Sequence, residues 1–267
     1  MLDEIIIAAS KNSTICSDDY IGEDGLLHCA KCGGKKQTVI TLAGERRTVN
    51  CTCECSQKER EEQKRLRIAA QLRRECFSSS RFQSCTFEAD TEPDSEASVI
   101  ARNYADSFDT GSSGWLVLCG DTGTGKSFRA ECICNRVTEK GFSARFTTFS
   151  EIERSLWNER DKQSVYSRLD RTALLVLDDF GCERKSDYMN EIRYNVICDR
   201  YDRGLPLVIT TNLAPSEFKS TDINDKRIYS RIFERGVFVS VMGEDKRKAQ
   251  LKANMKAERE KLSEAGN

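Results

Sequence analysis

The chain has 267 residues, and its 42 lysines and arginines nearly balance its 43 aspartates and glutamates, which gives a formal net charge of −1. This balance excludes a protein that binds nucleic acid through an overall basic surface, so any nucleic-acid site must be local. The N-terminal sequence MLDEIIIAAS is acidic, and its apolar run is too short for a signal peptide or a membrane span. We therefore expect a cytoplasmic protein with no membrane partner, built as one main domain with a small module attached.

Cysteines dominate the N-terminal part, where five of the 13 crowd into the segments CAKC and CTCEC. In a chain of this length without an export signal, they indicate a metal site rather than disulfides. Four thiolates close a tetrahedral Zn²⁺ site that leaves no position for water, so such a metal is structural. The alternative is a redox role for CAKC, although no thioredoxin-like pattern surrounds it. We expect zinc ligation by Cys29, Cys32, Cys51 and Cys53, with Cys55 a close competitor for the fourth position.

The segments around these cysteines predict the organisation of the chain. The sequence GGKKQTVITLAGERRTVN, between the two cysteine groups, predicts a short hairpin, and SQKEREEQKRLRIAAQLRRE predicts an exposed connecting helix. The acidic stretch DTEPDSEAS predicts a loop. We divide the chain into a cysteine-rich module (1–56), a charged linker helix (57–76), a main domain (77–247) and a basic tail (248–267).

The main domain shows a regular alternation. Its apolar runs WLVLC, ARFTTF, ALLVLDD, LPLVITTN and VFVSVM are separated by segments with helical character. Strands that alternate with helices in this way predict an α/β domain around a mainly parallel sheet.

A phosphate-binding loop follows the first of these strands. The sequence GDTGTGKS matches the pattern G-x-x-x-x-G-K-[ST] and lies between a predicted strand and a predicted helix. Its glycines let consecutive backbone N–H groups point into one concavity, and the helix adds its positive N-terminal end. Lys126 would reach the β- and γ-phosphates, and Ser127 would hold Mg²⁺. The predicted nucleotide-binding residues are Gly120, Asp121, Thr122, Gly123, Thr124, Gly125, Lys126, Ser127 and Phe128.

Two later strands end in polar side chains that suit hydrolysis. ALLVLDD ends in Asp178, which would complete the Mg²⁺ shell, and in Asp179, which can orient and deprotonate the attacking water. VITTN ends in Asn212, which could bind the γ-phosphate or that water, although asparagine is also common at strand ends. Two carboxylates beside a phosphate loop predict turnover rather than binding alone.

An amphipathic helix, RIYSRIFERG, carries arginines at every fourth position, Arg227, Arg231 and Arg235. Residues four apart share one helix face, opposite an apolar stripe. Such a row can be no more than a solvated face. A nucleoside triphosphatase of this layout still lacks a group that neutralises the charge on the transferred phosphoryl, however, and Arg231 could supply that group to a neighbouring subunit. The two flanking arginines could serve the same interface or contact DNA phosphates.

Taken together, GDTGTGKS, LLVLDDFG, ITTNL and RIYSRIFERG resemble, in order and spacing, the AAA+ ATPases of the DnaC and DnaI kind, which load bacterial replicative helicases. The resemblance covers roughly Phe77 to Arg247, and the cysteine-bearing N-terminus resembles a subset of these loaders, including phage and prophage versions. It implies ATP and Mg²⁺ as cofactors, Arg231 as the finger, and self-association into a spiral. It also implies that the N-terminal part grips the replicative helicase.

The same resemblance implies single-stranded DNA as a partner. The segment KSDYMNE looks like the one that carries some of the DNA contacts in these loaders. Ser186 is then a candidate for hydrogen bonding to phosphate and Tyr188 for stacking on a base, although Tyr188 could equally be a packing residue.

The expected function is therefore ATP-dependent loading of the replicative helicase onto single-stranded DNA during the initiation of replication. Two alternatives remain. Transposition helper ATPases resemble loaders across the core, but they usually lack a paired-cysteine module. An adaptor or inhibitor could keep the fold and occupy the helicase without turnover.

Overall fold

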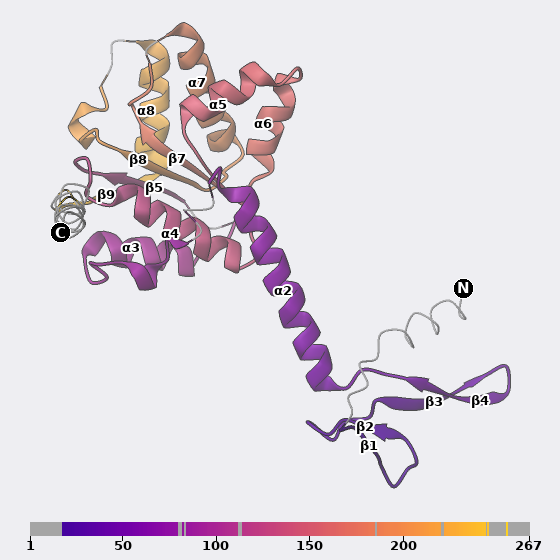
Figure 1. The fold of residues 1–267 in the computed structure, drawn as a ribbon. Coiled ribbons are helices and arrows are strands. Elements are labelled where there is room, and N and C mark those ends of the chain that lie inside the picture. The colour runs from indigo at the N-terminus through magenta and orange to yellow at the C-terminus, as the bar shows by residue number, and fades with distance from the viewer. Residues whose placement is uncertain are drawn as a thin grey trace, which may run out of the picture. The chain divides into compact units, whose positions relative to one another are not determined.

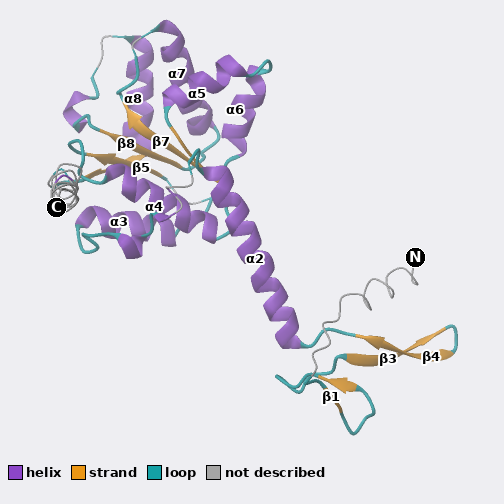
Figure 2. Ribbon diagram, in the orientation of Figure 1, coloured by secondary structure: helices purple, strands orange, loops and turns teal. Residues whose placement is uncertain are grey.

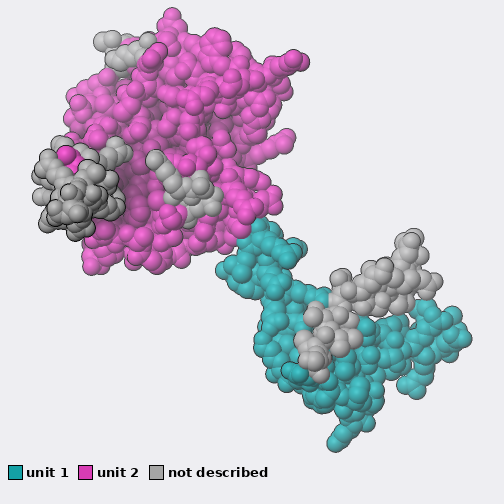
Figure 3. All heavy atoms as spheres, viewed as in Figure 1, with its two compact units in different colours: residues 1–68 teal, residues 69–267 magenta. Residues whose placement is uncertain are grey.

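The computed structural model describes residues 18–79, 82, 84–111, 114–184, 186–219, 222–243, 245 and 255. The proposed basic tail lies outside these residues except for Met255. The chain forms two compact units, Met1–Ile68 and Ala69–Asn267, shown in teal and magenta in Figure 3. The division falls within helix α2 (Glu54–Cys76), which begins three residues before the predicted start of the linker helix.

The first unit consists of two small antiparallel sheets. Strand β1 (Tyr20–Ile21) pairs with β2 (Leu27–His28), and β3 (Gln37–Leu42) pairs with β4 (Glu45–Asn50). The second pair confirms the predicted hairpin; its two turn residues, Ala43 and Gly44, both have positive φ, as a two-residue turn between twisted strands requires. In the described part of this unit, only Cys29, Lys36 and Cys53 are buried, so the unit has almost no apolar core.

The second unit is built around a parallel sheet with helices packed around it (Figures 1 and 2), which confirms the predicted α/β fold. Its five strands have the order β6-β7-β8-β5-β9. The strands are β5 (Trp115–Cys119), β6 (Ala144–Thr147), β7 (Leu174–Phe180), β8 (Leu207–Thr211) and β9 (Gly236–Ser240). Helices cover both faces, and for this reason the strands read as continuous apolar runs. They are α3 (Glu96–Asp106), α4 (Lys126–Glu139), α5 (Phe149–Asn158), α6 (Lys162–Arg171), α7 (Asp187–Asp202) and α8 (Ile223–Arg235).

Alternate residues of strand β5, which lies between β8 and β9, point into two separate cores. Leu116 and Leu118 pack with α3 and α4, whereas Val117 and Cys119 pack with the helices α5 to α8 on the other face. Two short 3₁₀ helices, Phe87–Ala89 and Pro215–Glu217, complete the described secondary structure. A search of the described helices found none that is both long and apolar enough to cross a membrane.

The sheet order determines where function can lie. Strands β7, β8 and β5 are adjacent and parallel, so their carboxyl ends meet at one edge of the sheet. The phosphate loop follows β5, the paired aspartates end β7, and Asn212 follows β8. The fold therefore brings three separate sequence motifs to one place, where open α/β sheets commonly bind ligands.

Candidate nucleotide-binding site

The phosphate loop joins β5 directly to α4 and wraps around the N-terminus of that helix. Gly125, with φ of 92°, is the residue before the helix and adopts a left-handed conformation that glycine tolerates best. At Gly120, a Cβ atom would lie 2.3 Å from the carbonyl oxygen of Val241, so no side chain fits there. The glycine pattern that predicted the loop thus has steric causes in this structure.

A cavity of about 660 Å³ opens beside this loop. Lys126 and Ser127 line it from the loop side, and Asp179 and Asn212 line it from the ends of β7 and β8. Of the predicted nucleotide-binding residues, Gly120, Asp121 and Thr124 are not among those that line the cavity, whereas the others are. The remaining wall consists of Phe82, Cys85, Ala89, Thr91 and Glu131.

Two of the loop residues stabilise the loop itself. The Thr124 hydroxyl, which is buried, donates a hydrogen bond to the carbonyl oxygen of Asp121 at 2.9 Å. Lys126 Nζ donates to the carbonyl oxygens of Gly120 and Asp121 at 2.8 and 2.7 Å. Lys126 as a whole is only 5% exposed, and its ammonium group lies at the loop, so it places a positive charge where phosphates would bind.

Asp178 is partly buried at the end of β7. Burial raises the pKa of its carboxyl group, and hydrogen bonds from Thr210 and Ser127 partly oppose that rise. Thr210 Oγ1 donates to Asp178 Oδ1 at 2.5 Å. A hydroxyl and a carboxylate in hydrogen-bond contact at the foot of a phosphate loop are oxygen ligands of the kind that Mg²⁺ prefers, so Ser127 and Asp178 fit this cofactor.

Asp179 has an unusual backbone conformation, with φ of 55°, and its N–H donates to Thr210 Oγ1 at 3.0 Å. The register between β7 and β8 shifts between Leu177 and Phe180, which is the signature of a bulge. Bulges re-aim side chains, and here the exposed Asp179 lines the cavity, whereas Asp178 is partly buried and does not.

Thr210 supports both aspartates, and the sequence analysis missed it. This side chain is fully buried, accepts from the backbone of Asp179 and donates to the carboxylate of Asp178. The available signal was the pair of threonines, Thr210 and Thr211, that ends an otherwise apolar strand just before Asn212. Asn212 itself is exposed and donates to the sulfur of Cys182 at 3.7 Å.

Arg129 was also missed, although it holds the phosphate loop in place. Its guanidinium is 1% exposed and donates to the carbonyl oxygens of Thr124 and Gly125, both at 3.2 Å. It also donates to Ser98 Oγ at 2.8 Å and pairs with Glu92 at 3.3 Å. Arg129 therefore connects the loop to the acidic segment that precedes α3.

The arginine helix α8 packs as predicted through Ile228 and Ile232, which are both fully buried. Arg227 and Arg235 are exposed, but Arg231 is only half exposed, unlike the fully outward row that the spacing suggests. Among the described residues, Arg231 is not one of those that line the 660 Å³ cavity.

The two predicted DNA-binding residues lie at the start of α7. Ser186 caps this helix, because its hydroxyl accepts a hydrogen bond from the N–H of Met189 at 3.1 Å. Tyr188 is partly buried, packs edge-on against Trp157 with 6.1 Å between ring centroids, and has Lys162 Nζ 5.3 Å above its ring. Trp157, which is 74% exposed, was not predicted as a DNA-binding candidate.

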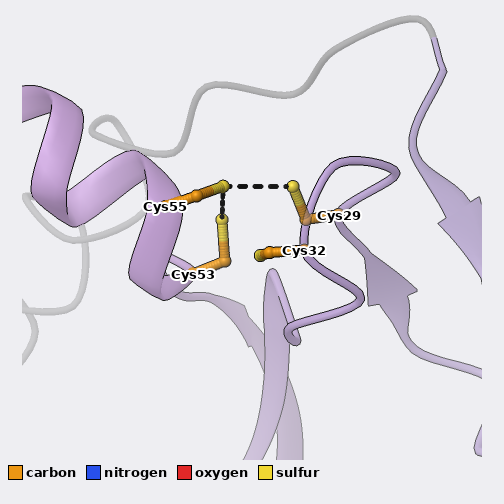
Figure 4. A group of neighbouring side chains, drawn as sticks. All are labelled: Cys29, Cys32, Cys53 and Cys55. Carbon is orange, nitrogen blue, oxygen red and sulfur yellow. Dashed lines mark hydrogen bonds between the residues drawn. The ribbon is translucent and has the colours of Figure 1, made fainter.

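Figure 4 shows the cysteine cluster of the first unit, in which the sulfur atoms of Cys29, Cys32, Cys53 and Cys55 all lie within 4.8 Å of one another. Cys29 and Cys53 each approach the Cys55 sulfur, at 3.5 and 3.4 Å. Four thiols at this spacing fit a tetrahedral zinc ion. We expected Cys51 among the ligands, but the structure places Cys55, the predicted competitor, in the cluster instead.

The cause lies in the backbone. The N–H of Cys51 still extends the hairpin ladder by donating to the Lys36 carbonyl oxygen at 2.8 Å, and its thiol donates to the Lys35 carbonyl oxygen at 3.4 Å. Helix α2 begins at Glu54, and its first turn brings Cys55 back toward Cys29.

The parallel sheet, phosphate loop and paired carboxylates define an ATP-binding domain of the AAA+ class. Within that class, the family model described as "IstB-like ATP binding protein" matches residues 51–254, and the chain belongs to this family.

Sequence relatives include two helicase loaders, as the resemblance predicted. The chain is 28% identical over 153 residues to the replicative helicase loader DnaI of Bacillus subtilis, covering 52% of this chain and 49% of that protein. It is 27% identical over 158 residues to the replicative helicase loader DnaC of Escherichia coli K12, covering 56% and 63%. The chain thus spans about half of the length of DnaI and less than two thirds of that of DnaC. It is also 29% identical over 111 residues to the putative ATP-binding protein Rv3427c in an insertion sequence of Mycobacterium tuberculosis, covering 39% and 42%.

Solved structures agree on the fold. A crystal structure of DnaI superimposes with a TM-score of 0.55 at 19% identity, covering 64% of this chain and 94% of that one. The DnaC helicase loader gives a TM-score of 0.53 at 21% identity, covering 61% and 100%. AMPPCP-bound DnaA from Aquifex aeolicus gives 0.52 at 16% identity, covering 70% and 56%.

Proposed function

We propose that this chain hydrolyses ATP and uses the reaction to load a replicative DNA helicase onto single-stranded DNA. The observation that carries the proposal is the meeting of Lys126, Ser127, Asp179 and Asn212 around one cavity, in a chain related to DnaI and DnaC. The names of those relatives describe helicase loaders, and the same role for this chain is part of the proposal.

The predicted catalytic residues at and beside the cavity would each have a role in hydrolysis. Bound Mg²⁺ would supply charge neutralisation on the β- and γ-phosphates, held by Ser127 Oγ and the Asp178 carboxylate. Lys126 would exchange its loop carbonyl partners for phosphate oxygens. Asp179 would orient the attacking water and accept its proton, and Asn212 would donate to the γ-phosphate or to that water.

Arg231 would complete the site from another copy of the chain. It does not line the cavity of its own subunit among the described residues, so it can act as a finger only across an interface. Arg231→Ala should leave nucleotide binding unchanged and lower turnover at high protein concentration by roughly 10³-fold or more. Arg168→Ala, which removes an exposed ion pair with Glu159, is the matched control. Unchanged turnover in the Arg231 variant would contradict the finger role.

Single-stranded DNA would bind near the start of α7, where Ser186, Tyr188 and Trp157 lie. A cavity of about 430 Å³ there is lined by Trp157 together with Arg154 and Arg184. Exposed aromatic rings and arginines are the side chains that stack bases and contact phosphates without reading sequence. The zinc-binding first unit would then present the surface that grips the helicase.

One experiment tests the proposal as a whole. The zinc-loaded protein is mixed with the replicative helicase of its host, and complex formation and ATP turnover are measured with and without single-stranded DNA. A stable complex with turnover that depends on DNA supports the loader. A stable complex without turnover would instead indicate an adaptor or inhibitor.

A second candidate is a transposition helper. It is favoured by the relatives from insertion sequences, in Mycobacterium tuberculosis and in Sinorhizobium fredii. If DNA raises turnover but the helicase is not bound, the same measurements should be repeated with the transposase of the element that encodes the chain.

A further inference from the structure

Two tyrosines of α7 form a frame around Arg231. The guanidinium carbon of Arg231 lies 5.8 Å from the ring centroid of Tyr194 and 5.2 Å from that of Tyr201. These tyrosines are seven residues apart, so both lie on the helix face that packs against α8. Arg235, one turn further along α8, also contacts this ring: its guanidinium carbon lies 5.3 Å from the ring centroid of Tyr201.

Tyr201 is itself fixed at two points. Its hydroxyl donates to Glu234 Oε1 at 2.7 Å, and its ring packs edge-on against Trp115 with 6.3 Å between centroids. The hydrogen bond to Glu234 raises the pKa of the tyrosine hydroxyl. Because Trp115 is buried in the inner strand β5, the ring of Tyr201 is a rigid support rather than a mobile surface side chain.

The frame leaves the charge of Arg231 available to an anion. Within the described part of the chain, no ion pair involves Arg231, and its buried Nε has no hydrogen-bond partner. Aromatic faces attract a guanidinium without neutralising it, in contrast to a carboxylate. A shallow cavity of about 330 Å³ adjoins the arginine and is lined by Arg227, Ser230 and the two tyrosines.

We infer that Tyr194 and Tyr201 are positioning residues, which hold the Arg231 guanidinium in the orientation that meets the terminal phosphate of a nucleotide bound by a second copy of the chain. The inference rests on the proposed function. Without the rings, Arg231 would sample many rotamers, and a misplaced charge-stabilising group can lower turnover by about 10²-fold. The effect should fall on kcat and leave the KM for ATP unchanged, because the frame does not touch the nucleotide of its own subunit.

The first set of variants separates the ring from the hydroxyl. Tyr201→Leu removes the ring, whereas Tyr201→Phe keeps the ring and loses only the bond to Glu234. We expect turnover of the assembled protein to fall by about 10- to 100-fold in the leucine variant and to stay near the wild-type value in the phenylalanine variant. Tyr194→Leu removes the other ring without touching Trp115, so the test does not depend on a single variant that could fold poorly.

A mixing experiment then shows whether the tyrosine acts through the finger. Tyr201→Leu has an intact nucleotide pocket and a displaced finger, whereas Lys126→Ala has a disabled pocket and an intact finger. Each variant alone should turn over slowly. When the two are mixed, Arg231 of the lysine variant can serve the pocket of the tyrosine variant, so turnover should reappear.

The outcomes distinguish the inference from the function on which it rests. If Arg231→Ala keeps full turnover, the finger role fails and the inference fails with it. If Arg231→Ala is inactive while both tyrosine-to-leucine variants turn over normally, the finger stands and the frame is refuted. If Tyr201→Leu is slow but is not rescued by mixing, the tyrosine acts within its own subunit, and the inference is again refuted.

Discussion

Cys51 and Cys55 are four residues apart, and the structure directs their thiols to different neighbours. Cys55 joins the cluster with Cys29, Cys32 and Cys53, whereas Cys51 donates to a carbonyl oxygen of the hairpin. The difference depends on where the strand β4 gives way to the helix α2. Cysteine spacing alone does not contain this information, which is why the sequence left two residues competing for one position.

A pair of serine substitutions tests this assignment. Cys55→Ser should lower the zinc content of the purified protein, because three thiolates remain where four close the site. Cys51→Ser should keep the wild-type zinc content and differ little in thermal stability. Metal analysis of the two variants decides the point, and the reverse pattern would restore Cys51 as the fourth ligand.

Arg129 illustrates a buried charge whose partners come from distant segments. Arg129→Met should destabilise the protein by about 3–5 kcal/mol, because it removes a buried guanidinium that lies 4.0 Å from the buried carboxylate of Asp90 and donates to two carbonyl oxygens of the loop. It should also weaken ATP binding, since the guanidinium supports the carbonyls of Thr124 and Gly125. The matched control is Arg136→Met on the same helix, which loses only the partly exposed pairs with Glu88 and Asp106. That control should change stability by less than about 1 kcal/mol.

At the scale of elements, one arginine links the loop after β7, beside the nucleotide cavity, to the arginine helix α8. Arg193 Nε lies 2.8 Å from Glu183 Oε1, in the loop after β7, and its NH1 group donates to Asp225 Oδ1 in the first turn of α8 at 2.9 Å. The other oxygen of Glu183 accepts from the N–H of Gly181 at 2.8 Å. A movement of the loop that follows Asp179 would therefore also displace the start of α8.

A double-mutant cycle measures this link. Arg193→Met, Asp225→Ala and the double variant should show a coupling of about 0.5–3 kcal/mol in unfolding free energy, as expected for contacting residues in one ion-pair network. The exposed pair Arg168 and Glu159 is the control, with an expected coupling below about 1 kcal/mol. Equal coupling energies in the two cycles would mean that the pair of Arg193 and Asp225 contributes no more to stability than an exposed ion pair.

The elements also show why some parts of the fold were predictable. Four strands of the second unit, β5, β6, β7 and β8, are largely buried on both faces, so their continuous apolar runs were visible in the sequence, as was the glycine pattern of the phosphate loop. Thr210, Arg129 and the tyrosine frame were not, because their roles arise from contacts between residues far apart in the chain. The start of α2 at Glu54 depends on a local competition between strand and helix that composition does not settle.

For the whole molecule, the two units differ in what stabilises them. The second unit has two large apolar cores, one on each face of its sheet. Between residues 18 and 68, the described part of the first unit, only two cysteines and the lysine at position 36 are buried, and the ammonium of that lysine pairs with Asp19 at 2.7 Å. A unit with so little apolar burial requires a staple, and a metal bound by four thiols can provide it.

Zinc removal should therefore affect the two units separately. A zinc-selective chelator, added with excess Mg²⁺, should unfold the first unit and abolish capture of the helicase. Binding of a fluorescent ATP analogue should persist, because the nucleotide cavity lies entirely in the second unit. Limited proteolysis reports the first change and nucleotide titration the second. Loss of both together would show that the ATPase core also depends on zinc.

The left-handed backbone of Asp179 has a consequence for how such a protein can change over evolutionary time. Aspartate and asparagine are the two non-glycine side chains that best tolerate the left-handed region, so asparagine can take the place of Asp179 at φ of 55° without changing the backbone. Replacing the residue that would activate water with asparagine should therefore carry little folding penalty. A lineage could then pass from active loader to silent helicase-binding adaptor by a single substitution, with a fold about as stable as before.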